Sequence, residues 1–469
     1  MSDSIDVIIV LPGLTGSTLG ESQNSLLPLW PSGALAAATA TATTGLAFWV
    51  KDAVASLGGA LWPIEPLGAS KGDFYGQFLN SLATSLNDAG GDYSVAYTSW
   101  PTINYEESNI YNVEYTWLNS ENGNKLSGNS LIGWAYDWRQ DNIVSAKMLQ
   151  NLLYNLCHAN DNIGSITLIG HSMGGVVARC YLESVGTNDP WFSKISQFIS
   201  LGTPAYGAPL ALNCITAPVP SIATSALAST VILSDPTFPI SNGGNWLLNA
   251  LGELSSFIQA AIVQNMQYII LSTLNYSAKN GLANPGTGPY QLLPPPEVGF
   301  IAVEGESAEQ PISPFSKLPG SMQEYLDNIH PFETNYVAAQ NLWNSLTYSG
   351  STPVPYNCVY GIVSSAYTSP NVKLTTTITE MTYSSSSTPP FSATATDGGG
   401  DTVVPYCSAS YYAPNLGPDL KTIPPQNPSL ANPPLQVNAV VGFDGVDHDN
   451  MPNFPQVQTQ IMKWLVPNS

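Results

Sequence analysis

The stretch Ser165-Ile166-Thr167-Leu168-Ile169-Gly170-His171-Ser172-Met173-Gly174-Gly175 decides the fold of this chain. A run rich in β-branched and aliphatic residues leads into Gly-x-Ser-x-Gly, and a helix-forming run follows without a turn residue. This order is typical of a strand, a sharp turn and a helix, with glycines that let the turn tighten and the helix start close to the strand. We therefore predict that Ser172 lies on this turn with its hydroxyl lifted above the sheet edge. The alternative is an ordinary strand-to-helix turn with a capping serine.

The composition is that of a large, weakly charged and acidic chain. Its 469 residues are 43% hydrophobic and only 10% charged, and 33 acidic residues outnumber 12 basic ones to give a net charge of −21. This charge excludes nucleic acid as a partner, because no basic surface is present to neutralise phosphates. It also disfavours anionic membranes, so any transient membrane-surface contact is expected to be apolar.

Residues 1–4 lead directly into a strand pattern, so we expect no N-terminal signal segment, and no uncharged apolar run is of membrane-spanning quality. A polar, lysine-poor composition is compatible with an exported protein, and the alternative is a cytoplasmic one. Five cysteines make an odd count and no disulfide framework. Cys358 and Cys407 are open to pairing, whereas Cys157 and Cys180 lie in helical patterns.

A second strand-and-loop pattern opens the chain. Asp6 to Leu11 is an apolar run typical of a central parallel strand, and it ends in Pro12-Gly13-Leu14-Thr15-Gly16-Ser17. A glycine-rich loop after a strand exposes backbone N–H groups, and beside a nucleophilic serine it is the expected first half of an oxyanion hole. A plain strand exit is the alternative. Residues from about 21 to 71 have weak helix and strand signals, and an excursion of this length is typical of a lid.

Alternating helix and strand patterns predict a mostly parallel sheet flanked by helices. Further strands are expected at 92–100, 131–134, 197–201, 356–363 and 437–442, helices at 74–86, 142–156 and 454–465, and a Ser/Thr-rich loop or hairpin at 375–390. The alternation lapses between 208 and 351, where 246–271 is amphipathic. We interpret this insert as a cap over the pocket, the alternative being an independent helical domain. The expected division is core 1–207, cap 208–351 and core 352–469.

A nucleophilic serine needs a base to take its proton and a carboxylate to orient that base. Of the four histidines, His448 follows the final strand at the carboxyl edge of the sheet, whereas His171 is expected to point into the scaffold. Asp397 and Asp401 compete for the role of the acid, and Asp401 is favoured because it is nearer to the ordered Val403-Val404-Pro405 turn. No His pair or Cys pair has metal-binding spacing, so we expect neither a metal nor another cofactor.

Several stretches together resemble the lecithin:cholesterol acyltransferase-like family of α/β-hydrolases, which includes lysosomal phospholipase, phospholipid:diacylglycerol acyltransferase and bacterial homologues. They occur in family order along nearly the whole chain. They are Val10-Leu11-Pro12-Gly13-Leu14-Thr15-Gly16-Ser17, Tyr136-Asp137-Trp138-Arg139, Gly170-His171-Ser172-Met173-Gly174-Gly175, Ser200-Leu201-Gly202-Thr203-Pro204, Cys358-Val359-Tyr360-Gly361, Gly400-Asp401 with Pro405-Tyr406-Cys407-Ser408-Ala409, and His448-Asp449-Asn450-Met451.

The resemblance implies an α/β-hydrolase fold with a lid and an inserted cap. It implies Ser172 as nucleophile, Asp401 as acid and His448 as base, with the backbone amides of Leu14 and Met173 as the oxyanion hole. One departure concerns the acid: the family usually has Gly-Asp-Gly-Thr-Val-Pro, whereas Thr402 and Val403 stand here in place of the Gly-Thr. A second concerns the lid, which mammalian members close with a disulfide and which has no cysteine here.

These features predict a serine acyl hydrolase or acyltransferase acting on ester bonds of phospholipids or similar lipids. An acyl-enzyme is expected to pass its acyl group to water or to an alcohol. The alternative is a general carboxylesterase or triacylglycerol lipase with the same three residues, and a third reading is a catalytically inactive binding protein. The expected partner is a lipid or ester substrate, with transient membrane contact through lid and cap.

Overall fold

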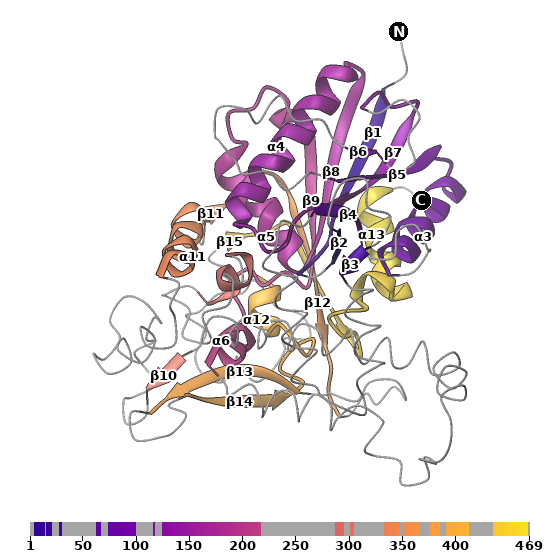
Figure 1. Ribbon diagram of the computed structural model, residues 1–469. Coiled ribbons are helices and arrows are strands. Elements are labelled where there is room, and N and C mark those ends of the chain that lie inside the picture. Colours follow the sequence, from indigo (N-terminus) through magenta and orange to yellow (C-terminus); the bar gives the residue numbers. More distant parts are fainter. Residues whose placement is uncertain are drawn as a thin grey trace, which may run out of the picture.

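The computed structural model describes fourteen stretches of the chain (Figure 1). They are residues 4–14, 16–20, 28–30, 62–66, 74–99, 116–117, 124–216, 287–294, 301–303, 333–347, 350–365, 376–384, 391–411 and 435–467. Much of the predicted lid and cap, including the amphipathic run 246–271, lies outside them. The division into core, cap and core therefore stays a prediction.

An eight-stranded sheet forms the centre of the described structure. In spatial order its strands are β16 (Ala439–Asp444), β12 (Tyr356–Ile362), β9 (Ile195–Leu201), β8 (Ile163–His171), β1 (Ile5–Leu11), β7 (Asn129–Ala135), β5 (Tyr93–Ser99) and β6 (Thr116–Trp117). All neighbours pair in parallel except β5 and β6. β1 lies in the middle and the chain adds strands on both sides of it, which creates the switch point where parallel sheets hold their ligands.

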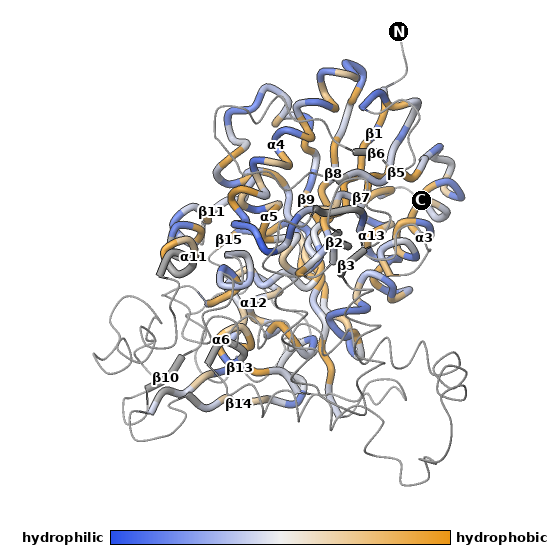
Figure 2. Tube along the Cα trace, in the orientation of Figure 1, coloured by the Kyte–Doolittle hydropathy of each residue, from blue (hydrophilic) through white to orange (hydrophobic). Residues whose placement is uncertain are grey.

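Helices cover both faces of the sheet, so its central strands are buried on both sides. In β1, Val7, Ile9 and Leu11 belong to one core cluster, whereas Ile8 and Val10 belong to another. The first cluster contains side chains of α4 (Asn142–Ala159) and α5 (Met173–Cys180). The second contains side chains of α3 (Tyr75–Asp88) and α13 (Pro455–Leu465), on the opposite face (Figure 1). Figure 2 shows the hydrophobic residues concentrated along the central strands.

The predicted fold class is confirmed: this is an α/β-hydrolase fold. Each expected core strand and helix is present with bounds shifted by a few residues. The Ser/Thr-rich stretch 375–390 contains β13 (Thr376–Tyr383), which pairs antiparallel with β14 (Phe391–Asp397) directly after the stretch, and β10 (Ile301–Val303) adds a third strand to this sheet. Short strands that the sequence patterns did not predict occur within the lid range: β3 (Pro28–Trp30) and β4 (Trp62–Pro66) flank β2 (Ser17–Gly20). Segments this short carry too little periodicity to be recognised.

The described remainder consists of short elements around this core. They are α6 (Pro209–Thr216), α11 (Glu333–Ser345), α12 (Tyr406–Ala409), the strands β11 (Gly350–Ser351) and β15 (Leu435–Gln436), a π turn η2 (Tyr181–Val185), and the 3-10 turns η3 (Phe192–Lys194), η4 (Gly288–Leu292) and η6 (Met451–Asn453). Among the described helices, none has the length and apolar character needed to cross a membrane.

A buried ion pair fixes the helix that follows the serine turn. Arg179 Nε lies 2.8 Å from Glu183 Oε1, and both side chains are almost fully buried. Arg179 also donates to the carbonyls of Ala205 and Thr347, and Tyr356 donates to Glu183. A buried ion pair needs such additional hydrogen bonds to offset its desolvation. Here the same hydrogen bonds also connect α5, η2, β12 and the segment before β11.

Candidate active site

Ser172 lies on a strained turn between β8 and α5, as the Gly-x-Ser-x-Gly pattern predicts. Its backbone has φ 53° and ψ −127°, a conformation that costs a residue with a side chain about 1–3 kcal/mol. The neighbouring glycines provide space. A Cβ on Gly170 would lie 2.5 Å from the Cα of Gly175, and one on Gly174 would lie 2.3 Å from the carbonyl oxygen of Leu11. The strain therefore falls on the serine itself, while the glycines let three backbones meet.

The structure brings Ser172, His448 and Asp401 together. Ser172 Oγ lies 2.8 Å from His448 Nε2, and His448 Nδ1 lies 2.7 Å from Asp401 Oδ2. The exposed fractions are 4% for the serine and 0% for the other two residues. Asp401 Oδ1 accepts hydrogen bonds from the amides of Val403 and Val404, so both carboxylate oxygens have partners. The arrangement can take a proton from the serine hydroxyl and hold the resulting imidazolium.

The competing carboxylate, Asp397, is held elsewhere. Its Oδ1 accepts from the amide of Ser365 at 2.8 Å and its Oδ2 from the hydroxyl of that residue at 2.6 Å. Asp397 ends β14, four residues before Asp401, and the turn between them directs the second aspartate to His448. The geometry therefore agrees with the choice of Asp401.

The pKa of His448 lies above its usual 6.5 as the net result of effects that act in opposite directions. Burial is the largest single effect and lowers the pKa, but the charge of Asp401, its hydrogen bond to Nδ1 and the charges of Asp449 and Asp447 together raise the pKa by more. In the neutral ring the proton on Nδ1 is donated to the carboxylate, and Nε2 accepts the hydrogen bond of Ser172. This is the tautomer that a general base requires.

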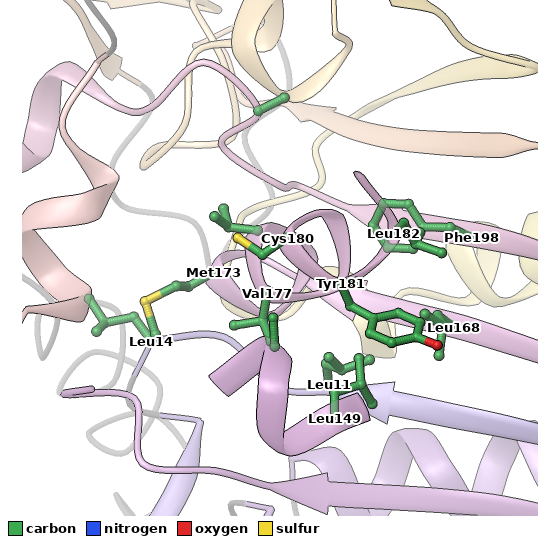
Figure 3. Close-up of a cluster of buried hydrophobic side chains, with 14 of the residues drawn as sticks. Leu11, Leu14, Leu149, Leu168, Met173, Val177, Cys180, Tyr181, Leu182 and Phe198 are labelled. Carbon is green, nitrogen blue, oxygen red and sulfur yellow. The ribbon is translucent and has the colours of Figure 1, made fainter. Parts of the chain in front are cut away.

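The loop after β1 passes directly over the serine. A Cβ on Gly13 would lie 2.8 Å from Ser172 Cβ and 3.3 Å from Ser172 Oγ, so the loop approaches as closely as it does because this residue is a glycine. Leu14 and Met173 follow Gly13 and Ser172 in the chain, and both residues are buried. Their side chains point toward one another (Figure 3). Within the described residues, neither backbone amide donates a hydrogen bond to another protein atom. Their role as an oxyanion hole stays a prediction.

Two buried polar residues of the site were not predicted to have a role. Tyr75, at the start of α3, accepts a hydrogen bond from the amide of Gly13 and contacts His171 Nδ1. His171 lies in the scaffold, as expected, but its Nε2 also contacts the backbone carbonyl of His448. No local signal identifies Tyr75, since it begins an ordinary amphipathic helix. Gly202 also contributes to the site, by leaving space for the acid: a Cβ atom added at this position would lie 2.9 Å from Asp401 Oδ2. The Gly202-Thr203-Pro204 motif was the available signal for it.

No group of His, Cys, Asp or Glu side chains in the described residues has the geometry of a metal site. Cys358 and Cys407, left open as a pair, are both buried free thiols. Asp137 and Arg139, from the Tyr136–Arg139 motif, form an ion pair, with Arg139 Nη2 2.6 Å from Asp137 Oδ2.

Comparison with known proteins gives a family for part of the chain. Residues 83–220 match the family model of lecithin:cholesterol acyltransferase. Phospholipase A(1) LCAT3 of Arabidopsis thaliana is 35% identical over 89 residues, and the match covers 18% of this chain and 19% of that relative. The chain thus spans about a fifth of the relative's length. Among solved structures, the lin2722 gene product of Listeria innocua aligns over 100% of this chain and 96% of its own, with 9% identity and a TM-score of 0.34.

The predicted family resemblance is thereby confirmed over residues 83–220. This stretch contains Ser172 and Met173 but not Leu14, Asp401 or His448. The roles of these five residues remain a proposal, for which the geometry described above is the support.

The role of Asp401 predicts a specific pH dependence. Activity should rise with pH as His448 loses its proton, with an inflection above the usual 6.5 because the pKa is raised. In Asp401→Asn the carboxylate charge is lost while burial still lowers the pKa, so the inflection should move to lower pH. The maximal rate should fall by about 10⁴-fold. The pH profile of kcat/KM measures both effects. Asp397→Asn is the matched control, and a shift in that variant instead would contradict the assignment.

Thr402 gives a stability prediction, because it stands where the family usually has a glycine and has φ 85°. A β-branched residue is strained in this region by about 1–2 kcal/mol. Thr402→Gly should therefore be more stable than Thr402→Ala by about 1 kcal/mol, as both lose the same packing but only glycine relieves the strain. Urea unfolding of the two variants tests this. At Thr84, in α3, the order should be reversed, since alanine is favoured in a helix by about 1 kcal/mol.

Proposed function

We propose that this chain, whose residues 83–220 match the family model of lecithin:cholesterol acyltransferase, is a serine acyl hydrolase or acyltransferase that acts on lipid esters. The observation that carries the proposal is the continuous hydrogen-bond chain from Ser172 Oγ through His448 to Asp401, buried at the carboxyl edge of a parallel sheet. A strained serine with a buried imidazole and carboxylate behind it is built for nucleophilic acyl transfer.

In the first step Ser172 Oγ attacks the ester carbonyl carbon while its proton passes to His448 Nε2. The negative charge moves to the carbonyl oxygen, which the Leu14 and Met173 amides would stabilise; one such donor contributes about 3 kcal/mol. His448 then gives its proton to the departing alkoxide, the ester C–O bond breaks and an alcohol leaves. The acyl group remains bound to Ser172. Asp401 holds the imidazole in position and stabilises its positive charge throughout.

In the second step a hydroxyl compound attacks the acyl-enzyme. His448 takes its proton and returns it to Ser172 Oγ as the tetrahedral intermediate collapses. Water releases a fatty acid, whereas an alcohol yields a new ester, so hydrolase and acyltransferase differ only in the acceptor. Exclusion of water by the lid and cap would favour transfer to an alcohol.

The lipid character of the substrate rests on two observations. The family match names an acyltransferase of lecithin and a sterol, and the Arabidopsis relative is named a phospholipase. Two apolar residues, Leu14 and Met173, follow Gly13 and Ser172 in the chain, and both of their side chains are buried. We propose that lid and cap contact the lipid surface through apolar groups, because a net charge of −21 repels anionic head groups.

The role of the nucleophile is tested by Ser172→Ala. This variant should lose about 10⁶-fold in kcat on p-nitrophenyl butyrate, because no other described side chain can replace the attacking oxygen. The same variant should also fail to react with a fluorophosphonate probe. Ser145→Ala, which removes another buried hydroxyl, is the matched control and should retain wild-type rate and labelling. Full activity in Ser172→Ala would refute the proposed mechanism.

The substrate class is tested with vesicles. Phosphatidylcholine vesicles should be consumed with release of fatty acid or, when cholesterol is included, of cholesteryl ester, both measured by mass spectrometry. Phosphatidylglycerol vesicles should react more slowly at low salt, and the difference should shrink as salt screens the charge of the chain. Turnover of tributyrin and soluble esters without turnover of phospholipid would instead identify a general carboxylesterase or triacylglycerol lipase.

A further inference from the structure

A second chain of hydrogen bonds runs through the site beside the one that the proposed mechanism uses. The amide of Gly13 donates to Tyr75 Oη over 2.8 Å. Tyr75 Oη lies 2.6 Å from His171 Nδ1, and His171 Nε2 lies 2.9 Å from the backbone oxygen of His448. All these contacts are buried. The chain therefore connects the loop over the serine to the backbone of the proposed base.

The direction of each hydrogen bond follows from the chemistry of the groups. A carbonyl oxygen only accepts, so His171 Nε2 carries a proton and donates it to His448. Burial, followed by the proximity of His448, lowers the pKa of His171 to about 3, so the ring is neutral and its Nδ1 is an acceptor. Burial also raises the pKa of Tyr75, which keeps its hydroxyl proton and donates it to Nδ1. Only one arrangement of protons satisfies the whole chain.

This chain of hydrogen bonds, which we call the bridge, ties helix α3 and the backbone of His448 to β1 and β8, two strands that already pair in the sheet. Gly13 belongs to the loop after β1, Tyr75 to α3, and His171 to the end of β8. On the opposite side, the amide of His448 donates to the backbone oxygen of Asp401 over 2.9 Å. The peptide groups of His448 are thus held from both sides, on one by the loop that carries the acid and on the other by the bridge.

The backbone at the start of α3 supports a positional role for Tyr75. Phe74, the residue before it, has φ 47°, one of four described residues other than glycine with a positive φ. Its carbonyl oxygen accepts from Asn453 Nδ2 and from the amide of Phe78. A strained residue persists only where its surroundings fix it, and these contacts fix the backbone directly before Tyr75.

We infer that Tyr75 and His171 are positioning residues. They hold the Gly13–Leu14 loop and His448 at a fixed position relative to each other, so that the oxyanion-binding amide and the base act on the same carbonyl group. This inference rests on the proposed function. Neither side chain touches the reacting atoms. Both act through the backbone, by fixing where the Leu14 amide and the imidazole lie relative to Ser172.

The first test is Tyr75→Phe, which removes one hydroxyl and keeps the ring. It should lower kcat by about tenfold or more, since small displacements of reacting groups cost about this much, while KM changes less than about twofold. A trifluoromethyl ketone, which forms a tetrahedral adduct with the serine, should lose affinity by the same factor as kcat/KM. Rates are divided by the fraction of protein that a fluorophosphonate labels at completion, so that misfolded protein does not contribute.

The second test is a double-mutant cycle with His171→Gln. The glutamine amide retains a donor toward His448 but offers Tyr75 no ring nitrogen, so each single variant breaks the bridge at the same link. If the bridge acts as a unit, Tyr75→Phe/His171→Gln should be about as slow as the slower single variant. Multiplication of the two effects, or a loss below about twofold in Tyr75→Phe, would overturn the inference.

The matched control is Tyr181→Phe, which removes a buried hydroxyl that accepts from Trp191 Nε1 and donates to Asp189. It should lower the melting temperature as Tyr75→Phe does, yet leave kcat and the affinity for the ketone unchanged. Failure of the wild-type protein to turn over any ester would refute the proposed function. A functioning wild type with an unimpaired Tyr75→Phe variant would refute only the bridge.

Discussion

The close approach of three backbones around Ser172 is the constraint on which the site depends. The end of β8, the start of α5 and the loop after β1 meet where Gly170, Gly174 and Gly13 leave no room for a Cβ atom. The first two contacts are with backbone atoms, which cannot rotate away as a flexible side chain does. The serine between them has a positive φ of 53°. This packing brings the serine hydroxyl, the N-terminus of α5 and the loop at Gly13 close together.

The position of each carboxylate, more than its negative charge, decides which aspartate orients the imidazole of His448. Three aspartates lie within two residues of it or in contact with it, yet only Asp401 places an oxygen on Nδ1. Asp447 accepts from Asn450, and burial raises its pKa. Burial raises the pKa of Asp449 to about 7, so this carboxyl is partly protonated near neutral pH. The carboxylate with fixed geometry and two amide donors is therefore the one that orients the imidazole.

Much of the fold was readable from sequence because its signals are local. The strand before Ser172 and the apolar run of β1 each lie in one continuous segment, and the glycine pattern marks the turn between strand and helix. Asp401 was separable from Asp397 because an ordered turn follows it directly. The short strands β3 and β4 were not predictable, since three to five residues show no usable periodicity. Tyr75 was not predictable either, because its partners are 62 and 96 residues away.

At Thr402 the sequence pattern and the three-dimensional contacts are both needed to explain the residue. The sequence marks it as a departure from the family pattern, and the backbone shows why a glycine is usual there. The threonine is held in this conformation because its amide donates to Thr377 Oγ1, from the hairpin strand β13. Since the next two amides donate to Asp401, the hairpin is connected to the imidazole through three successive hydrogen-bond steps. A Ser/Thr-rich hairpin that looks peripheral in the sequence therefore supports the acid, and this dependence is visible only once long-range contacts are known.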